Sequence, residues 1–124
     1  GGLSDSIPFE KAFEDGCDRV VVVLTREASY RKTTSSSTKR IAKMFRRYPN
    51  LSEDLLMRAE RYNSTLDKLE QYEAEGKILV IRPDDTKGFS RLEKDMDKIQ
   101  SLYDNGFKKG SVAADKVIGF FTEM

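Results

Sequence analysis

The sequence predicts an α/β protein, because apolar segments typical of strands alternate along the chain with segments that have the apolar period of a helix. The strand prediction depends on two runs, RVVVVLT at 19–25 and KILVIR at 77–82. Consecutive apolar residues of this kind are typical of strands that are covered on both faces. The helix prediction depends on apolar residues that recur every three or four positions between and after these runs.

A short helix is expected before the first strand. Pro8 suits a first helical position, where its missing N–H is not needed. Phe9 and Phe13 then share one face, and Gly16 is placed to end the helix. After the first strand, the polar stretch TTSSST ends a segment, 25–38, that we expect to be a loop.

Two helices are expected between the strands. The first covers 39–48 and is ended by Pro49, because the residue before a proline is pushed out of the helical region. Its apolar face holds Ile41, Met44, Phe45 and Tyr48. The second covers 52–75, with Ser52 as its N-cap and Gly76 as its end. Its apolar face holds Leu55, Ala59, Tyr62, Leu66, Leu69 and Tyr72.

The chain after the second strand is expected to be helical. Ser90 and Glu93 have the spacing of a capping box, which predicts that a helix starts there, and Gly106 is placed to end it. The apolar segment 112–121 is expected to form a separate terminal helix, weakened by Gly119.

The two predicted strands do not make a complete sheet. Strands this apolar need neighbours at their edges and layers on both faces, and the sequence supplies two clear strands. We therefore expect either that another copy completes the sheet, as a homo-oligomer, or that the chain is a fragment of a larger domain.

Composition excludes several classes of site. The chain has no histidine and one cysteine, which excludes a Ser-His-Asp triad, a Cys-His pair and any His-ligated metal site within it. We expect Cys17 to be a small buried hydrophobe. Neither G-x-x-x-x-G-K nor G-x-G-x-x-G occurs, which argues against a phosphate-binding α/β domain. No metal or cofactor is expected.

Charge and hydropathy indicate location only weakly. The net charge is +1, so bulk charge does not point to nucleic acid, and we expect no nucleic-acid partner. The first residues lack the pattern of a signal peptide, and no apolar run approaches the roughly 18 residues of a membrane span. The expectation is a cytoplasmic protein, with peripheral attachment to a membrane as the alternative.

The opening GGLSDSIPFEKAFEDGCDRVVVVLTR resembles the end of the catalytic domain of bacterial patatin-like phospholipases. Further motifs stand in the order that this group has, including its C-terminal extension. They are DSIP (5–8), LTR (24–26), YRK (30–32), YPNLSEDLLMRAERYN (48–63), EGKILVIRP (75–83), SRLEKD (90–95) and the region 103–106. The resemblance covers roughly residues 1–108.

The resemblance implies a serine acyl hydrolase of lipid metabolism, an esterase or phospholipase in which an aspartate activates a serine in a G-x-S-x-G turn. In that family the aspartate directly precedes two small residues, which Gly1 and Gly2 match. The sequence has no counterpart of the serine, the oxyanion-hole glycines or that aspartate. We therefore expect the chain to lack catalytic activity of its own. A lipid or an ester would be the substrate of the parent enzyme.

The implied fold is a fragment of a three-layer α/β/α patatin-like domain with a helical C-terminal extension. Residues 1–38 would end the catalytic domain, 39–108 would form the extension, and 109–124 would be a terminal helix or tail. In this setting the chain completes the sheet of the parent enzyme and caps or orients its active site.

The stretch 31–47 holds seven lysines and arginines and no acidic residue. With the apolar face of the helix at 39–48 it predicts a basic amphipathic helix, which is typical of membrane surfaces. Arg40, Lys43 and Arg47 are the candidate contacts to an anionic membrane. The alternative function is therefore a non-catalytic module that docks on a membrane or a protein. The purely structural alternative is that the apolar face packs on the protein body.

Arg58, Tyr62 and Arg82 are the candidates for binding a substrate or an anion, because Arg58 and Tyr62 lie one turn apart on the predicted helix. The alternative is that these residues tie the helix to the strand. Asp5 could be taken for a catalytic acid, but a turn or N-cap role ahead of Pro8 is favoured.

Overall fold

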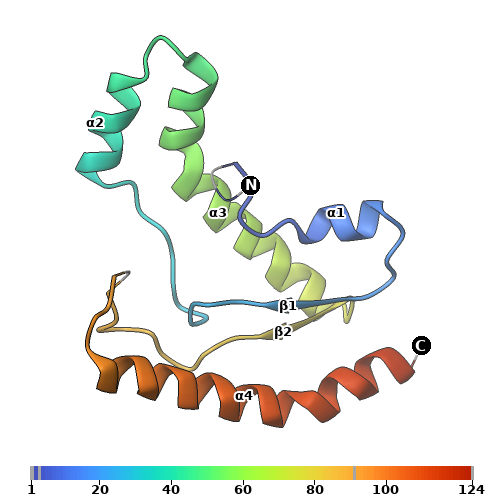
Figure 1. Ribbon diagram of the computed structural model, residues 1–124. Helices are drawn as coiled ribbons and strands as arrows, with labels where there is room; N and C mark the ends of the chain where they lie inside the picture. The colour runs from blue at the N-terminus through green and yellow to red at the C-terminus, as the bar shows by residue number, and fades with distance from the viewer. Residues whose placement is uncertain (1, 3, 91, 124) are drawn as a thin grey trace.

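The structure, a computed structural model, describes residues 2, 4–90 and 92–123. Its elements follow one another as helix, strand, two helices, strand and helix (Figure 1). They are α1 (Phe9–Glu14), β1 (Val20–Val23), α2 (Ser36–Met44), α3 (Pro49–Ala74), β2 (Ile78–Ile81) and α4 (Met96–Thr122). The prediction of a mixed α/β protein is confirmed.

The two strands pair in parallel, so the prediction that both runs belong to one sheet is confirmed. The register places Val20 opposite Ile78 and Val23 opposite Ile81. Each strand is shorter than its apolar run. The connection between them runs through α2 and α3, as parallel neighbours require a long crossover.

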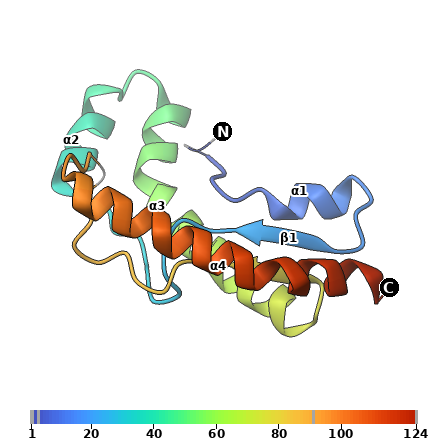
Figure 2. The ribbon, with the colours of Figure 1, turned by 60° about the horizontal axis from the view of Figure 1, so that its bottom comes forward.

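Helices lie on both sides of this small sheet. The helices α1 and α3 lie on one side and α4 runs along the other, as Figures 1 and 2 show from two directions. The buried core lies between the sheet and the helices α1 and α3. Its members are Phe9, Val22, Leu24, Leu66, Leu69 and Ile78. Because side chains alternate along a strand, Val22 is buried while Val23 is 70% exposed.

The helix α3 is one unbroken helix, as predicted, but it begins at Pro49 rather than after Ser52. Proline suits the first turn, and the Ser52 hydroxyl instead donates to the Ala42 carbonyl at 3.0 Å, which ties α3 to α2. Gly76 ends the helix with φ of 76°, and Lys77 N–H reaches back to the Tyr72 carbonyl at 3.1 Å.

The predicted end of the first helix is also confirmed. Gly16 has φ of 99°, and the N–H of Cys17 reaches back to the Ala12 carbonyl at 3.1 Å. The prediction of a buried Cys17 is wrong, because this closing turn leaves the side chain exposed.

Two predicted helix starts are wrong, and in both cases the observed start is fixed by an N-cap residue that the prediction did not use. The helix α2 begins at Ser36, inside the expected loop, because the Ser35 hydroxyl accepts the N–H of Thr38 at 3.2 Å. The helix α4 begins after Asp95, whose carboxylate accepts the N–H of Asp97 at 3.0 Å. The Ser90 N–H does donate to the Glu93 carboxylate at 3.2 Å, but the Ser90 hydroxyl accepts the N–H of Leu92 rather than that of Glu93, and no helix starts there.

The prediction that a helix ends at Gly106 is wrong as well. The single helix α4 passes through Gly106 and Gly119 and ends at Thr122. Glycine weakens a helix interior by about 1 kcal/mol, and α4 continues at that cost along the face of the sheet. Within the described ranges, no helix is long and apolar enough to cross a membrane.

Candidate functional site

Gly2, one of the two glycines that match the small residues after the family's aspartate, lies in a turn. Gly1 lies outside the described residues. The carbonyl of Gly2 accepts a hydrogen bond from the Ser6 hydroxyl at 2.9 Å, and Asp5 is exposed. Asp5 lines an open cavity beside α3 together with Glu10 and Arg61.

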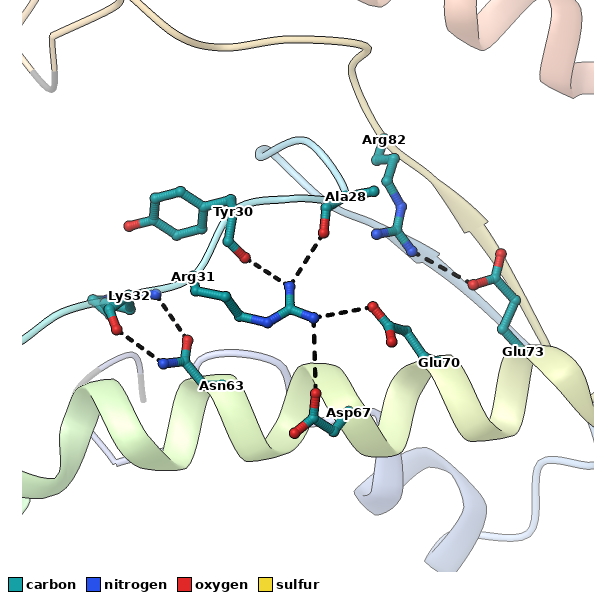
Figure 3. A network of polar contacts seen from close by, with 9 residues as sticks. All are labelled: Ala28, Tyr30, Arg31, Lys32, Asn63, Asp67, Glu70, Glu73 and Arg82. Carbon is teal, nitrogen blue, oxygen red and sulfur yellow. Dashed lines mark hydrogen bonds and ion pairs between the residues drawn. The ribbon is translucent and has the colours of Figure 1, made fainter.

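A polar network holds the segment after β1 against α3 (Figure 3). The Arg31 guanidinium donates to the carbonyls of Ala28 and Tyr30, at 3.1 and 2.8 Å. It also forms ion pairs with Asp67 and Glu70 of α3, at 3.7 and 3.2 Å. Arg31 therefore shapes the loop and fixes it to the helix at the same time.

Tyr62, one of the predicted anion-site residues, packs among aromatic and cationic groups. Its ring meets that of Tyr30 edge to face at 6.0 Å, and the Lys32 ammonium lies 5.0 Å from the ring centre. Burial raises the pKa of the Tyr62 phenol, and the neighbouring arginines, among them Arg26, partly offset this. The phenol therefore stays protonated at neutral pH.

Arg82, a second predicted residue, forms an ion pair with Glu73 at the end of α3, at 3.5 Å (Figure 3). It also lines an apolar cavity between the sheet and α4, with Val23 and Leu102. Arg82 thus lies in a different cavity from Arg58, and its contact with Glu73 is the helix-to-strand tie that the alternative interpretation describes.

Arg58, the third predicted residue, lies at the wall of a cavity of about 230 Å³ between α2, α3 and the segment before α2. Its lining residues are Lys32, Thr33, Thr34, Thr38, Ile41, Leu55, Arg58 and Ala59. The Nε atom of Arg58 is buried and has no hydrogen-bond partner in the described part of the chain. Arg58 also borders a much smaller cavity of about 10 Å³, together with Tyr62 and Asp5.

The basic amphipathic helix is present as α2, but the prediction that it runs to Tyr48 is wrong, because α2 ends at Met44 and residues 45–48 form the turn before α3. The large apolar side chains of the predicted face are mostly exposed. Ala42 is the buried residue of α2, whereas Met44 and Tyr48 are 79% and 65% exposed. Ile41 and Phe45 are also exposed, although less so. The basic residues of this segment are exposed too: Lys39, Arg40, Lys43, Arg46 and Arg47.

A contact that sequence reasoning missed joins the turns after the two strands. Thr86 is buried, and its hydroxyl donates to the Glu27 carboxylate while its N–H donates to the same group at 3.2 Å. The Arg26 guanidinium donates to the Thr86 hydroxyl at 3.3 Å. These bonds to Thr86 are the main reason that the pKa of Glu27 is below its ordinary value. No periodic pattern marks a lone threonine in a turn.

Within residues 2, 4–90 and 92–123, no group of three or more cysteine, aspartate or glutamate side chains is placed to hold a metal ion. The arrangement instead offers cations and hydroxyls around Arg58 and an exposed basic helix beside them.

Comparison with known proteins gives one match. A family model described as a domain of unknown function, DUF6363, matches residues 48–121. No curated protein and no solved structure matches the chain. The matched segment begins just before α3, includes β2 and ends in the last turn of α4, so it contains Arg58 but not α2. Because it covers more than half of the sequence, the chain belongs to the DUF6363 family.

Proposed function

We propose that this chain is the C-terminal part of a patatin-like serine acyl hydrolase, and that it gives the enzyme a surface that docks on anionic membranes. The catalytic serine, aspartate and oxyanion hole would lie elsewhere in the parent enzyme. The chain would then contribute membrane attachment and part of a three-layer α/β/α domain.

The ordered motifs from Gly1 to Gly106 support the patatin-like part of the proposal. The sheet supports it as well, since β1 and β2 are parallel and have helices on both sides. Among the described residues β1 has β2 as its one strand neighbour, which leaves an edge where a further strand of a larger sheet would pair.

The gene sequence tests this part directly. We expect an aspartate codon immediately before that of Gly1 and a G-x-S-x-G motif upstream in the same reading frame. Another residue at that position, without the upstream motif, contradicts the patatin-like proposal. The purified 124-residue chain should also not hydrolyse p-nitrophenyl esters faster than the uncatalysed reaction. Turnover that disappears in Asp5→Ala would make Asp5 catalytic and overturn the assignment.

The docking part depends on one observation, the exposure of Met44 at the end of α2 and of Tyr48 in the turn that follows, beside the basic residues of 39–47. Large apolar side chains beside lysines and arginines are the combination that interfacial helices use. Arg40 lies one helical turn from Met44, so apolar insertion and contact with lipid phosphates occur on the same face. Figure 1 shows that α2 stands away from the sheet and from α4, where a flat surface can reach it.

The expected strength follows from the charges. Each basic residue near an anionic membrane contributes about 1 kcal/mol. The five basic residues of 39–47 therefore contribute about 5 kcal/mol at low salt, before the insertion of Met44 and Tyr48 is counted. Binding of this kind falls as ionic strength rises, because salt screens exposed charges.

Vesicle sedimentation tests the docking proposal. We expect the chain to pellet with vesicles that contain phosphatidylglycerol and to stay in solution with pure phosphatidylcholine. Combined reversal of Arg40, Lys43 and Arg47 to glutamate should abolish pelleting, and Met44→Ser should weaken it. Phe107→Ser, on the exposed face of α4, is the matched control and should pellet as the unchanged chain does. Equal pelleting of the charge-reversed variant would overturn the proposal.

A further inference from the structure

Among the described residues, the guanidinium of Arg58 has no acidic partner, which distinguishes it from two neighbouring arginines. Arg61, one turn further along α3, forms an ion pair with Asp54. Arg31 pairs with Asp67 and Glu70. For Arg58, the part of the chain that the structure describes provides neither a carboxylate nor a hydrogen-bond acceptor, although its Nε atom is buried.

An unpartnered charged group of this kind is costly. A buried donor that belongs to a charged group destabilises a protein when it is left without an acceptor, because it has lost its water and gained no partner. Such a group is retained where a ligand or ordered water supplies the acceptor. The cavity of about 230 Å³ beside Arg58 has room for roughly seven waters, given a share of about 30 Å³ for each, so an anion can enter by displacing water.

The other walls of this cavity are chemically matched to an anion. Lys32 and the hydroxyl-bearing residues Thr33, Thr34 and Thr38 line it with Arg58, and no acidic residue does. Buried Ala59 forms part of its apolar wall. Arginine, lysine and hydroxyl donors together suit a tetrahedral oxyanion, which accepts several charge-assisted hydrogen bonds at once.

The walls are held in place by contacts outside the cavity. The backbone of Lys32 is bonded to the Asn63 side chain at 2.8 and 2.9 Å. The hydroxyl of Thr38 lies 2.9 Å from that of Ser35, which caps α2. The hydroxyl of Ser52 ties α3 to α2. A site fixed in this way loses little conformational entropy when the ligand binds.

We infer that this cavity binds a phosphate group, either free inorganic phosphate or the phosphomonoester headgroup of a lipid such as phosphatidic acid, with Arg58 as the central contact. This is not a glycine-rich phosphate loop. It is a crevice between two helices in which side chains, rather than backbone N–H groups, supply the donors. The inference depends on Arg58 and its cavity and not on the membrane proposal, which rests on the exposed face of α2.

Asp5 is the competing explanation for Arg58. Asp5 and Arg58 both line the cavity of about 10 Å³, but the buried Nε of Arg58 has no hydrogen-bond partner among the described residues, Asp5 included. If Asp5 neutralises Arg58 in solution, Asp5→Asn should strengthen phosphate binding strongly. If the cavity holds the phosphate as we infer, Asp5→Asn should change the affinity by no more than about twofold.

Calorimetric titration with inorganic phosphate at fixed ionic strength tests the inference. We expect saturable binding at one site, and amide NMR shifts confined to residues 32–38 and 55–59. Arg58→Gln should weaken binding about ten- to hundredfold, since hydrogen bonds to charged groups contribute about 1.5 to 3 kcal/mol. Arg58→Lys keeps the charge and should be intermediate. Arg61→Gln is the matched control on the same helix and should bind within about twofold of the unchanged chain.

Two vesicle compositions identify the source of the phosphate. Phosphatidic acid and phosphatidylglycerol are compared at equal surface charge, with Arg58→Gln in parallel. An Arg58-dependent preference for phosphatidic acid identifies a lipid headgroup, and soluble binding without this preference identifies free phosphate. No saturable binding to either, or equal binding by an Arg58→Gln variant with an unchanged circular dichroism spectrum, overturns the inference. The Met44→Ser variant should retain soluble phosphate binding, which separates a failure of this site from a failure of membrane docking.

Discussion

The side-chain amide of Asn63 bonds to the backbone of Lys32 in both directions, with Oδ1 accepting the N–H at 2.8 Å and Nδ2 donating to the carbonyl at 2.9 Å (Figure 3). A helix side chain thus takes the place that a neighbouring strand would have beside an extended segment. It satisfies the backbone of a part-buried residue that belongs to no strand or helix. The pair holds the segment between β1 and α2 in place where it lines the cavity beside Arg58.

We expect Asn63→Ala to destabilise the protein by about 1 to 3 kcal/mol, because the Lys32 N–H and carbonyl both lose their partner in a part-buried place. Urea denaturation measures the free energy of unfolding. Ser64→Ala, at an exposed neighbouring position, should change it by less than about 0.5 kcal/mol. Equal stability of the two variants would mean that water replaces the amide without loss.

The contact between Glu27 and Thr86 should make stability depend on pH. The Thr86 hydroxyl is the largest cause that holds the pKa of Glu27 below its ordinary value of 4.5. A carboxyl whose pKa is depressed by folding contributes stability above its unfolded pKa, and that contribution is lost as pH falls through the folded value. Thr86→Val should therefore lower the melting temperature at pH 7, and the difference should shrink below pH 4. A difference that is constant from pH 7 to pH 3 would contradict this origin.

Two glycines should respond to alanine with opposite signs. Gly76 has φ of 76° in the closing turn of α3, so Gly76→Ala should destabilise the protein by about 1 to 2 kcal/mol. Gly106 lies inside α4 without a positive φ, so Gly106→Ala should stabilise it by up to about 1 kcal/mol. An added Cβ meets no atom within 4 Å at either position, which leaves the backbone as the cause. Chemical denaturation that shifts both variants in one direction would contradict this assignment.

The sequence allowed β1 and β2 to be predicted from their continuous apolar runs, and α3 from its periodic apolar face and from Gly76 at its end. It did not allow the start of α2 or the length of α4 to be predicted, since these depend on which of several polar residues caps the helix. Arg58 could be predicted as a candidate anion-binding residue because it lies one helical turn from Tyr62. That it has no carboxylate partner depends on Asp54 pairing with Arg61 instead, which is a property of the folded structure.

The outer edge of β1 should pair two copies of this chain. The N–H groups of Val20 and Leu24 bond to the carbonyls of Lys77 and Ile81, at 3.1 and 2.8 Å. By alternation the backbone groups of Val21 and Val23 point to the opposite edge. An unpaired edge of this kind recruits a strand. Antiparallel pairing about a twofold axis at Val22 places Val21 opposite Val23 of the second copy. It also places the acidic residue 18 opposite the basic residue 26 of that copy, which favours the register.

Sedimentation at micromolar concentration should therefore show the 124-residue chain as a dimer. Val23→Lys should dissociate it, because a lysine on an edge strand opposes pairing and because Val23 is exposed, so the folded monomer tolerates the change. Val112→Lys, which adds the same charge on the exposed face of α4, is the matched control and should remain dimeric. A monomer at the same concentration would show that α1 and α4 protect the edge without a second copy. A dimer that Val112→Lys dissociates, while Val23→Lys does not, would place the interface on α4 instead.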